Sequence, residues 1–143
     1  MSPARPSASR PPASRPPAMT PDEYRRMAAL EGSHWWFQGT RRVIFDQLDR
    51  LLPSLPNRPP TILDLGCGTG GTTRLLARRG PTLGVDAVLL PLQWARQSEP
   101  QLCWLQASAA ALPLPDGACD LIVALDVLEH LPDDRAALAE IAR

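Results

Sequence analysis

The stretch Ile62-Leu63-Asp64-Leu65-Gly66-Cys67-Gly68-Thr69-Gly70-Gly71 decides the fold. Its first four residues are apolar apart from one aspartate, which predicts a short buried strand. The glycines that follow permit a sharp turn from this strand into a helix, and they let a ligand lie against bare backbone. The segment therefore predicts a strand, a Gly-rich ligand-binding loop and a helix, in that order.

Short apolar runs alternate with helix-length stretches on the carboxyl-terminal side of this loop. Such alternation is typical of βαβ units and predicts an α/β fold around a parallel sheet. We expect strands at 61–65, 82–86, 102–106 and 120–125, and helices at 70–79, 90–97 and from 132 to the end of the chain.

Two helices and two proline-rich segments are expected on the amino-terminal side. Residues 1–18 hold six prolines and three arginines but no acidic residue, which predicts a disordered tail. Residues 19–52 should form a helical cap, with one helix from Thr20 to about residue 32 and another from near residue 40 to residue 52. Residues 53–60 form a proline-rich linker, and residues 61–143 should be a partial α/β domain.

Composition excludes several classes of function. The chain has 15 basic and 15 acidic residues, so it carries no excess positive charge to bind nucleic acid. The three cysteines lack the spacing of a zinc site or a disulfide framework, and we expect small buried fillers. No apolar run is long enough to span a membrane and no signal peptide begins the chain, so we expect a cytoplasmic protein.

Two carboxylates define the expected chemistry of the loop. Asp86 ends the next strand 20 residues after Gly66, where a carboxylate can accept hydrogen bonds from ribose hydroxyls. The spacing of Gly66, Gly68 and Gly71 also fits the dinucleotide pattern GxGxxG, so a nicotinamide or flavin cofactor is an alternative. Asp64 separates the two readings, because a carboxylate there repels a pyrophosphate but attracts a cationic methionyl group.

Ordered motifs over about 70 residues resemble those of class I methyltransferases. The matching segments are Leu63-Asp64-Leu65-Gly66-Cys67-Gly68-Thr69-Gly70, Gly84-Val85-Asp86, Ala111-Leu112-Pro113-Leu114-Pro115-Asp116, Cys119-Asp120-Leu121-Ile122 and Asp126-Val127-Leu128-Glu129-His130-Leu131. The resemblance implies a Rossmann-like sheet of strand order 3-2-1-4, S-adenosyl-L-methionine as cofactor and a small-molecule acceptor. It implies cofactor-binding roles for Asp64, Gly66, Cys67, Gly68, Gly70, Asp86, Ala87, Ser108, Ala109 and Asp126, whereas no catalytic base can be named.

An aromatic segment precedes the domain. Residues 31–37, Glu-Gly-Ser-His-Trp-Trp-Phe, with Arg41 and Arg42, resemble a segment of one methyltransferase subgroup, which implies a cap over the cofactor cleft. Two adjacent tryptophans are more often core or lid packing than a recognition device, although a cation–π contact to the sulfonium is chemically feasible.

The chain departs from the family pattern at two places. Ser108 stands where the family has an acidic residue that accepts from the adenine amino group, which predicts weaker cofactor binding, while the Ala109 N–H can still donate to the ring. The chain also ends inside the fourth helix, so strands five to seven of the family are missing. The apolar run 121–125 then becomes a sheet edge, and we expect self-association through it.

Three functions remain open on the sequence alone. The first is an active methyltransferase, and the second is a fragment that binds the cofactor without turnover. The third is a dinucleotide-dependent oxidoreductase.

Overall fold

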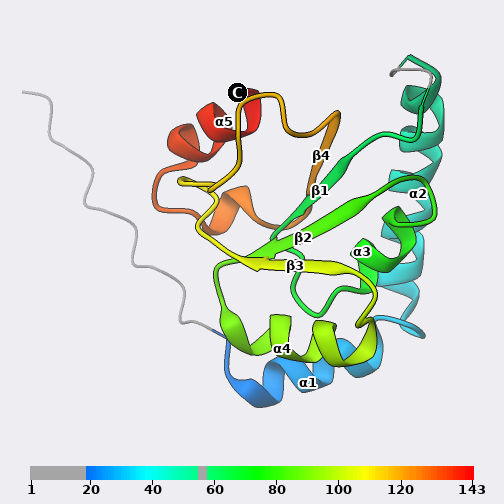
Figure 1. The fold of residues 1–143 in the computed structure, drawn as a ribbon. Helices are drawn as coiled ribbons and strands as arrows, with labels where there is room; N and C mark the ends of the chain where they lie inside the picture. Colours follow the sequence, from blue (N-terminus) through cyan, green and yellow to red (C-terminus); the bar gives the residue numbers. More distant parts are fainter. Residues whose placement is uncertain (1–18, 55–57) are drawn as a thin grey trace, which may run out of the picture.

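The computed structural model describes residues 19–54 and 58–143, which form a parallel four-stranded sheet with helices on both faces (Figure 1). The strands are β1 (Ile62–Leu65), β2 (Thr82–Asp86), β3 (Cys103–Gln106) and β4 (Leu121–Ala124), in the order β3-β2-β1-β4. The α/β class, the Rossmann-like sheet and the strand order 3-2-1-4 are thus confirmed. Each strand lies within one residue of its predicted bounds.

Five α-helices accompany the sheet. They are α1 (Pro21–Leu30), α2 (Trp35–Leu51), α3 (Gly71–Leu76), α4 (Leu89–Ser98) and α5 (Asp134–Ala142), with short 3-10 helices η1 (Leu52–Ser54) and η2 (Leu128–His130). Figure 1 shows α5 on the opposite side of the sheet from α1 and α4. All four residues of β1 are buried, as expected of a central strand that is paired on both sides.

Alternate residues of β1 pack into two separate cores. Ile62 packs on one face with Leu48 of α2 and Leu76 of α3. Leu63 and Leu65 point to the other face and pack in the cluster that contains Ala137 of α5. The period-two alternation of a strand therefore divides the core between α2 and α3 on one face of the sheet and α5 on the other.

The helix boundaries follow local capping contacts. Thr20 caps α1 as predicted, because its hydroxyl accepts from the Glu23 N–H at 3.3 Å while the Glu23 carboxylate accepts from the Thr20 N–H at 2.6 Å. The prediction that the second helix begins near residue 40 was wrong. His34 Nδ1 accepts from the Trp36 N–H at 3.3 Å, so α2 begins at Trp35.

Two other predicted helices were too long. The helix expected over 70–79 is α3, which ends at Leu76 in a turn. The helix expected from residue 132 begins two residues later, because the Asp133 carboxylate caps α5 by accepting from the Ala136 N–H at 3.0 Å.

The described part of the linker is tied to the sheet. Both Arg58 terminal nitrogens donate to the Asp120 carboxylate at 2.9 Å, and the Thr61 N–H donates to the same carboxylate at 2.8 Å. These bonds from Thr61 and Arg58 hold the pKa of Asp120 below its ordinary value. The contacts join the amino ends of β1 and β4. The predicted tail 1–18 and residues 55–57 of the linker lie outside the described residues.

The remaining composition-based expectations have mixed outcomes. Across residues 19–54 and 58–143, no helix is both long and apolar enough to cross a membrane. Cys67 is buried, as expected of a small filler, but Cys103 is exposed at the outer strand β3, where the prediction of burial was wrong. Within the same residues no three His, Cys, Asp or Glu side chains are grouped to hold a metal ion.

Candidate functional site

The Gly-rich loop between β1 and α3 is held tightly against its neighbours. The N–H groups of Gly66 and Cys67 both donate to the Val85 carbonyl, at 2.7 and 3.0 Å. Gly66 has φ of 75°, and a Cβ added there would lie 2.2 Å from Val127 Cγ2. Gly70 has φ of 86°, and its added Cβ would lie 2.5 Å from the Trp104 ring. Only glycine meets both demands, so the loop presents bare backbone.

Asp86 joins the end of β2 to this loop. One carboxylate oxygen accepts from the Gly68 N–H at 2.9 Å, and the other accepts from the Val88 N–H at 2.8 Å. A carboxylate has about four acceptor positions, so two remain for a ligand. Ala87 follows directly, and its carbonyl accepts from the Gln106 side chain at 3.0 Å. The predicted ribose-binding residue and the predicted loop thus form one unit.

Asp64 is buried inside the sheet rather than standing at the tip of β1. The residue is 2% exposed, and its carboxylate accepts from the Thr73 hydroxyl of α3 at 2.5 Å. Burial raises the pKa of Asp64 to about 6, and the nearby Asp86 charge adds to this shift while the Thr73 bond opposes it. An ionised Asp64 therefore lacks the solvation that a surface carboxylate has. Burial likewise raises the pKa of the Cys67 thiol in the loop beside it.

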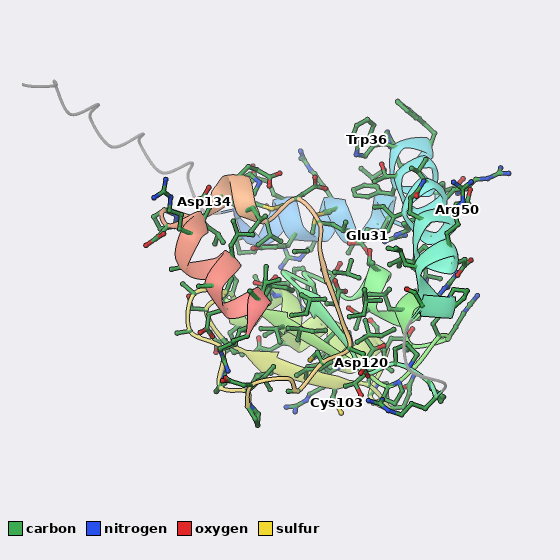
Figure 2. The ribbon with its side chains drawn as sticks, turned by 90° about the horizontal axis from the view of Figure 1, so that it is seen from above. Glu31, Trp36, Arg50, Cys103, Asp120 and Asp134 are labelled. Atoms are coloured by element: carbon green, nitrogen blue, oxygen red, sulfur yellow. The ribbon has the colours of Figure 1, made fainter. Side chains whose placement is uncertain are left out.

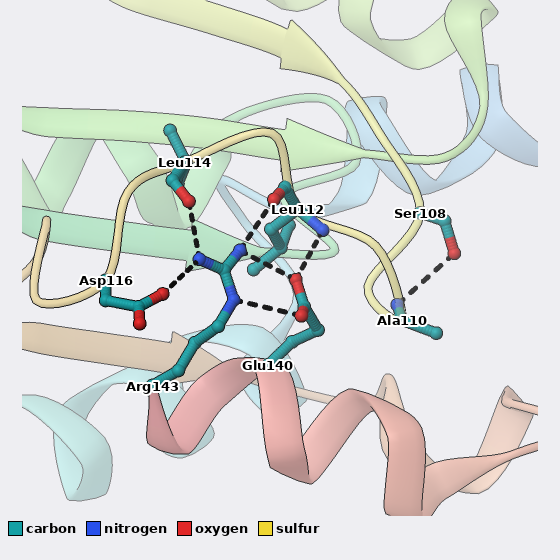
Figure 3. A network of polar contacts seen from close by, with 7 residues as sticks. All are labelled: Ser108, Ala110, Leu112, Leu114, Asp116, Glu140 and Arg143. Carbon is teal, nitrogen blue, oxygen red and sulfur yellow. Dashed lines mark hydrogen bonds and ion pairs between the residues drawn. The ribbon is translucent and has the colours of Figure 1, made fainter.

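A polar network joins the segment after β3 to the end of α5 (Figure 3). Arg143 donates to the Leu112 and Leu114 carbonyls at 2.6 and 2.5 Å, and it is ion-paired with Glu140 at 2.8 Å. Glu140 in turn accepts from the Leu112 N–H at 2.6 Å. These contacts attach the Leu-Pro segment to the end of α5.

Ser108 and Ala109 lie between β3 and that Leu-Pro segment. The Ser108 hydroxyl accepts from the Ala110 N–H at 3.2 Å (Figure 3), while the side chain remains exposed. Ala109 is buried, and within the described part of the chain its N–H has no hydrogen-bond acceptor. A free N–H beside an exposed hydroxyl is a donor–acceptor pair that suits an adenine edge.

Asp126 follows β4 at the same end of the sheet. It is exposed and has φ of 53°, which makes it the one non-glycine residue with positive φ among those the structure describes. This conformation is costly for a residue with a Cβ, and such strain is found preferentially at functional sites. It also places Val127 against Gly66.

The amino-terminal helices cover the loop. Met27 of α1 lies 3.6 Å from the Cβ position of Gly68, and the Glu31 carboxylate accepts from the Thr69 hydroxyl at 2.8 Å. Tyr24 of α1 is buried, and burial, and secondarily the Asp86 charge, raises the pKa of its hydroxyl. Figure 2 shows Glu31 where α1 and α2 meet, above the sheet.

The two tryptophans of the aromatic segment do not take part in this cover. Trp35 and Trp36 are 72% and 54% exposed, so the expectation of core or lid packing was wrong for both. They begin α2, where Figure 2 shows Trp36 at the outer end of the helix. Phe37 and Arg41, in contrast, are partly buried, and the guanidinium lies 6.0 Å from the Phe37 ring.

Most predicted site residues lie at the carboxyl ends of the parallel strands. The Gly68–Asp86 bond joins the loop to the end of β2, and Asp64 lies beneath the same loop. Ser108 and Asp126 follow β3 and β4 at this edge, although no hydrogen bond between described residues links either to Asp86. Sequence reasoning missed Tyr24 and Met27, which no motif marks. A surface hollow of about 640 Å³ lies at the amino ends of the strands, around 80–83 and 101–103, and none of these site residues lines it.

Known proteins resemble this chain in sequence. Residues 63–143, more than half of the chain, match the model of a family described as a methyltransferase domain. Trans-aconitate 2-methyltransferase of Azoarcus sp. (strain BH72) is 43% identical over 86 residues, which are 58% of this chain and 34% of that protein. A Mycobacterium tuberculosis protein named "Probable S-adenosylmethionine-dependent methyltransferase" is 31% identical over 120 residues, 83% of this chain and 42% of that protein.

A solved structure agrees on the fold. A Methanococcus maripaludis protein superimposes with a TM-score of 0.71 at 18% identity, covering 85% of this chain and 57% of that chain. The chain thus spans about a third to two fifths of the length of the two curated relatives above. The matched residues contain the Gly-rich loop, Asp86 and the segment that follows β4, and on this ground the chain belongs to the family of S-adenosylmethionine-dependent methyltransferases.

Proposed function

We propose that this chain binds S-adenosylmethionine across the carboxyl ends of β1 and β2 and supports methyl transfer to a small-molecule acceptor. The observation that carries the proposal is the Gly68–Asp86 bond, which puts a carboxylate with free acceptor positions beside bare loop backbone. Asp86 would bind the ribose, and the loop from Gly66 to Gly70 would lie under the methionyl part. The small-molecule acceptor is proposed because trans-aconitate 2-methyltransferase is among the similar proteins.

The chemistry is a single displacement. When bound, S-adenosylmethionine would supply a methyl group on a sulfonium, and transfer of that methyl to the acceptor would leave the C–S electron pair on sulfur as S-adenosylhomocysteine. Sulfonium is already a good leaving group, so the residues of this chain mainly orient the reactants. Ser108 and the Ala109 N–H would hold the adenine, and the strained Asp126 would face the cofactor from the end of β4.

Titration calorimetry with S-adenosylhomocysteine and with NAD tests the proposal. We expect heat of binding with the first and none with the second, because the Asp64 carboxylate lies beneath the loop and repels a pyrophosphate. Binding of NAD in preference to S-adenosylhomocysteine would refute the assignment. A role in cofactor binding without turnover is the second candidate, because the described sheet has four strands and the relatives above are much longer than this chain.

Replacing Ser108 should strengthen cofactor binding. In Ser108→Asp the neutral acceptor becomes a charged one, and bonds to charged groups are worth roughly 1 kcal/mol more, so affinity for S-adenosylhomocysteine should rise about fivefold. An aspartate can also keep the bond from the Ala110 N–H. Ser108→Asn, which adds similar volume without charge, is the control. Equal affinities for the two variants would mean that the adenine amino group lies elsewhere.

We also propose that a second copy of the chain pairs with the outer edge of β4. The Leu121 N–H donates toward β1, so the alternating ladder turns the N–H groups of Ile122 and Ala124 away from β1. Neither proline nor charge interrupts this apolar strand. Hydrogen exchange of these two amides should slow as protein concentration rises, in step with the dimer fraction from light scattering. Exchange that is fast at every concentration would disprove the pairing.

A further inference from the structure

Arg41 and Glu31 form a partly buried ion pair beside the Gly-rich loop. Arg41 Nη2 lies 3.3 Å from Glu31 Oε2, and the two side chains are only 14% and 16% exposed. Arg41 Nη1 also donates to the Glu31 carbonyl at 2.6 Å. Both residues precede the segment that matches the family model, so the match assigns neither of them a role.

The pair touches the loop backbone directly. A Cβ added to Gly71 would lie 2.0 Å from Glu31 Oε2 and 2.4 Å from Arg41 Nη2. The other Glu31 oxygen accepts from the Thr69 hydroxyl at 2.8 Å. A ligand that lies along this loop would therefore meet one positive and one negative group side by side.

The geometry of this pair differs from that of two bidentate ion pairs in the same protein. Arg58 and Arg79 each make two bonds to one carboxylate, at 2.9 and 2.9 Å to Asp120 and at 2.7 and 2.9 Å to Asp49. Arg41 makes one carboxylate contact at 3.3 Å, which is long for a charge-assisted bond. A guanidinium has five N–H donors, so Arg41 keeps donors for a second carboxylate.

We infer that Arg41 and Glu31 bind the amino-acid end of the cofactor. The Arg41 guanidinium would bind the α-carboxylate, and the Glu31 carboxylate would bind the α-ammonium. Two ion pairs with the ligand would then replace the ion pair between Arg41 and Glu31. The inference rests on the proposed function. It predicts that Arg41 and Glu31 make the site bind ligands with this zwitterion more tightly than nucleosides that lack it.

Two nucleosides separate this role from a structural one. S-adenosylhomocysteine carries the amino-acid end, whereas 5′-methylthioadenosine has the same adenosine and a sulfur but no zwitterion. By calorimetry, the parent chain should bind S-adenosylhomocysteine at least tenfold more tightly than 5′-methylthioadenosine. Arg41→Met should weaken the binding of S-adenosylhomocysteine about tenfold and change the affinity for 5′-methylthioadenosine by less than twofold. Arg41→Lys should restore part of the lost affinity.

Arg50→Met is the matched control, because Arg50 is exposed on the same helix and lies outside the aromatic segment. It should change neither affinity. If Arg41→Met weakens the binding of both nucleosides equally, or of neither, the inference is overturned and the proposed function stays intact. Equal affinities of the parent for the two nucleosides would overturn it without any variant. A parent that binds neither nucleoside would refute the proposed function itself, and the inference with it.

Discussion

Asp86→Ala is expected to weaken binding of S-adenosylhomocysteine roughly 10- to 150-fold, because hydrogen bonds to a charged group are worth about 1.5–3 kcal/mol. The affinity is measured by titration calorimetry. The same carboxylate also accepts from the N–H groups of Gly68 and Val88, so its removal frees the middle of the Gly-rich loop and the turn that follows β2. The predicted loss therefore has two sources, a lost ribose contact and a less ordered loop.

A ligand analogue separates these two sources. The parent should bind S-adenosylhomocysteine much more tightly than its 2′,3′-dideoxyribose analogue, and Asp86→Ala should bind the two alike. The pair of ligands and the pair of proteins form a double cycle whose coupling reports the ribose contact alone. If the parent does not distinguish the two ligands, Asp86 only anchors the loop and the ribose assignment is wrong.

The order and pairing of the strands could be predicted because they follow from local patterns. The glycines at 66, 68 and 70 and the apolar runs around them specify a βαβ fold with little help from tertiary contacts. Helix starts were less predictable. The periodicity of α2 begins near residue 40, whereas its first residue, Trp35, follows from a single side-chain contact made by His34.

The composition of the site could be predicted only where a motif carries it. Asp86 and the loop glycines stand in such a motif, and they lie together as expected. Met27 and Arg41 reach the loop because α1 and α2 pack beside it, which is a tertiary arrangement that no periodicity encodes. The same holds for the tryptophans, since the sequence gives their hydrophobicity but not the face of the molecule on which α2 begins.

Asp64→Asn is expected to stabilise the protein above pH 6. Burial raises the pKa of Asp64 from 3.8 to about 6, and each pKa unit corresponds to about 1.4 kcal/mol. Between pH 4 and pH 6 the folded state therefore holds a proton that the unfolded state has released. Its free energy of unfolding falls as pH rises through this window and stays lower by about 3 kcal/mol at pH 8.

Asparagine has no such titration and can still accept the Thr73 hydroxyl bond through its amide oxygen. In urea unfolding, the two proteins should be about equally stable at pH 4, and the variant should be more stable by about 3 kcal/mol at pH 8. A variant that is less stable than the parent at pH 8 would mean that the ionised carboxylate is well solvated in the folded protein.

A buried charge that lowers stability at neutral pH calls for a functional reason, and the cofactor's sulfonium supplies one. An ionised Asp64 beneath the loop attracts the cation of S-adenosylmethionine and has no such effect on the neutral thioether of S-adenosylhomocysteine. Asp64→Asn should therefore weaken the binding of S-adenosylmethionine more than that of S-adenosylhomocysteine at pH 8. Titration calorimetry with both ligands measures the two affinities. The difference should shrink as pH falls through 6, because the parent carboxyl then becomes neutral as well. Equal losses for the two ligands at pH 8 would show that Asp64 does not act on the sulfonium, and that its buried charge serves only the contact with Thr73.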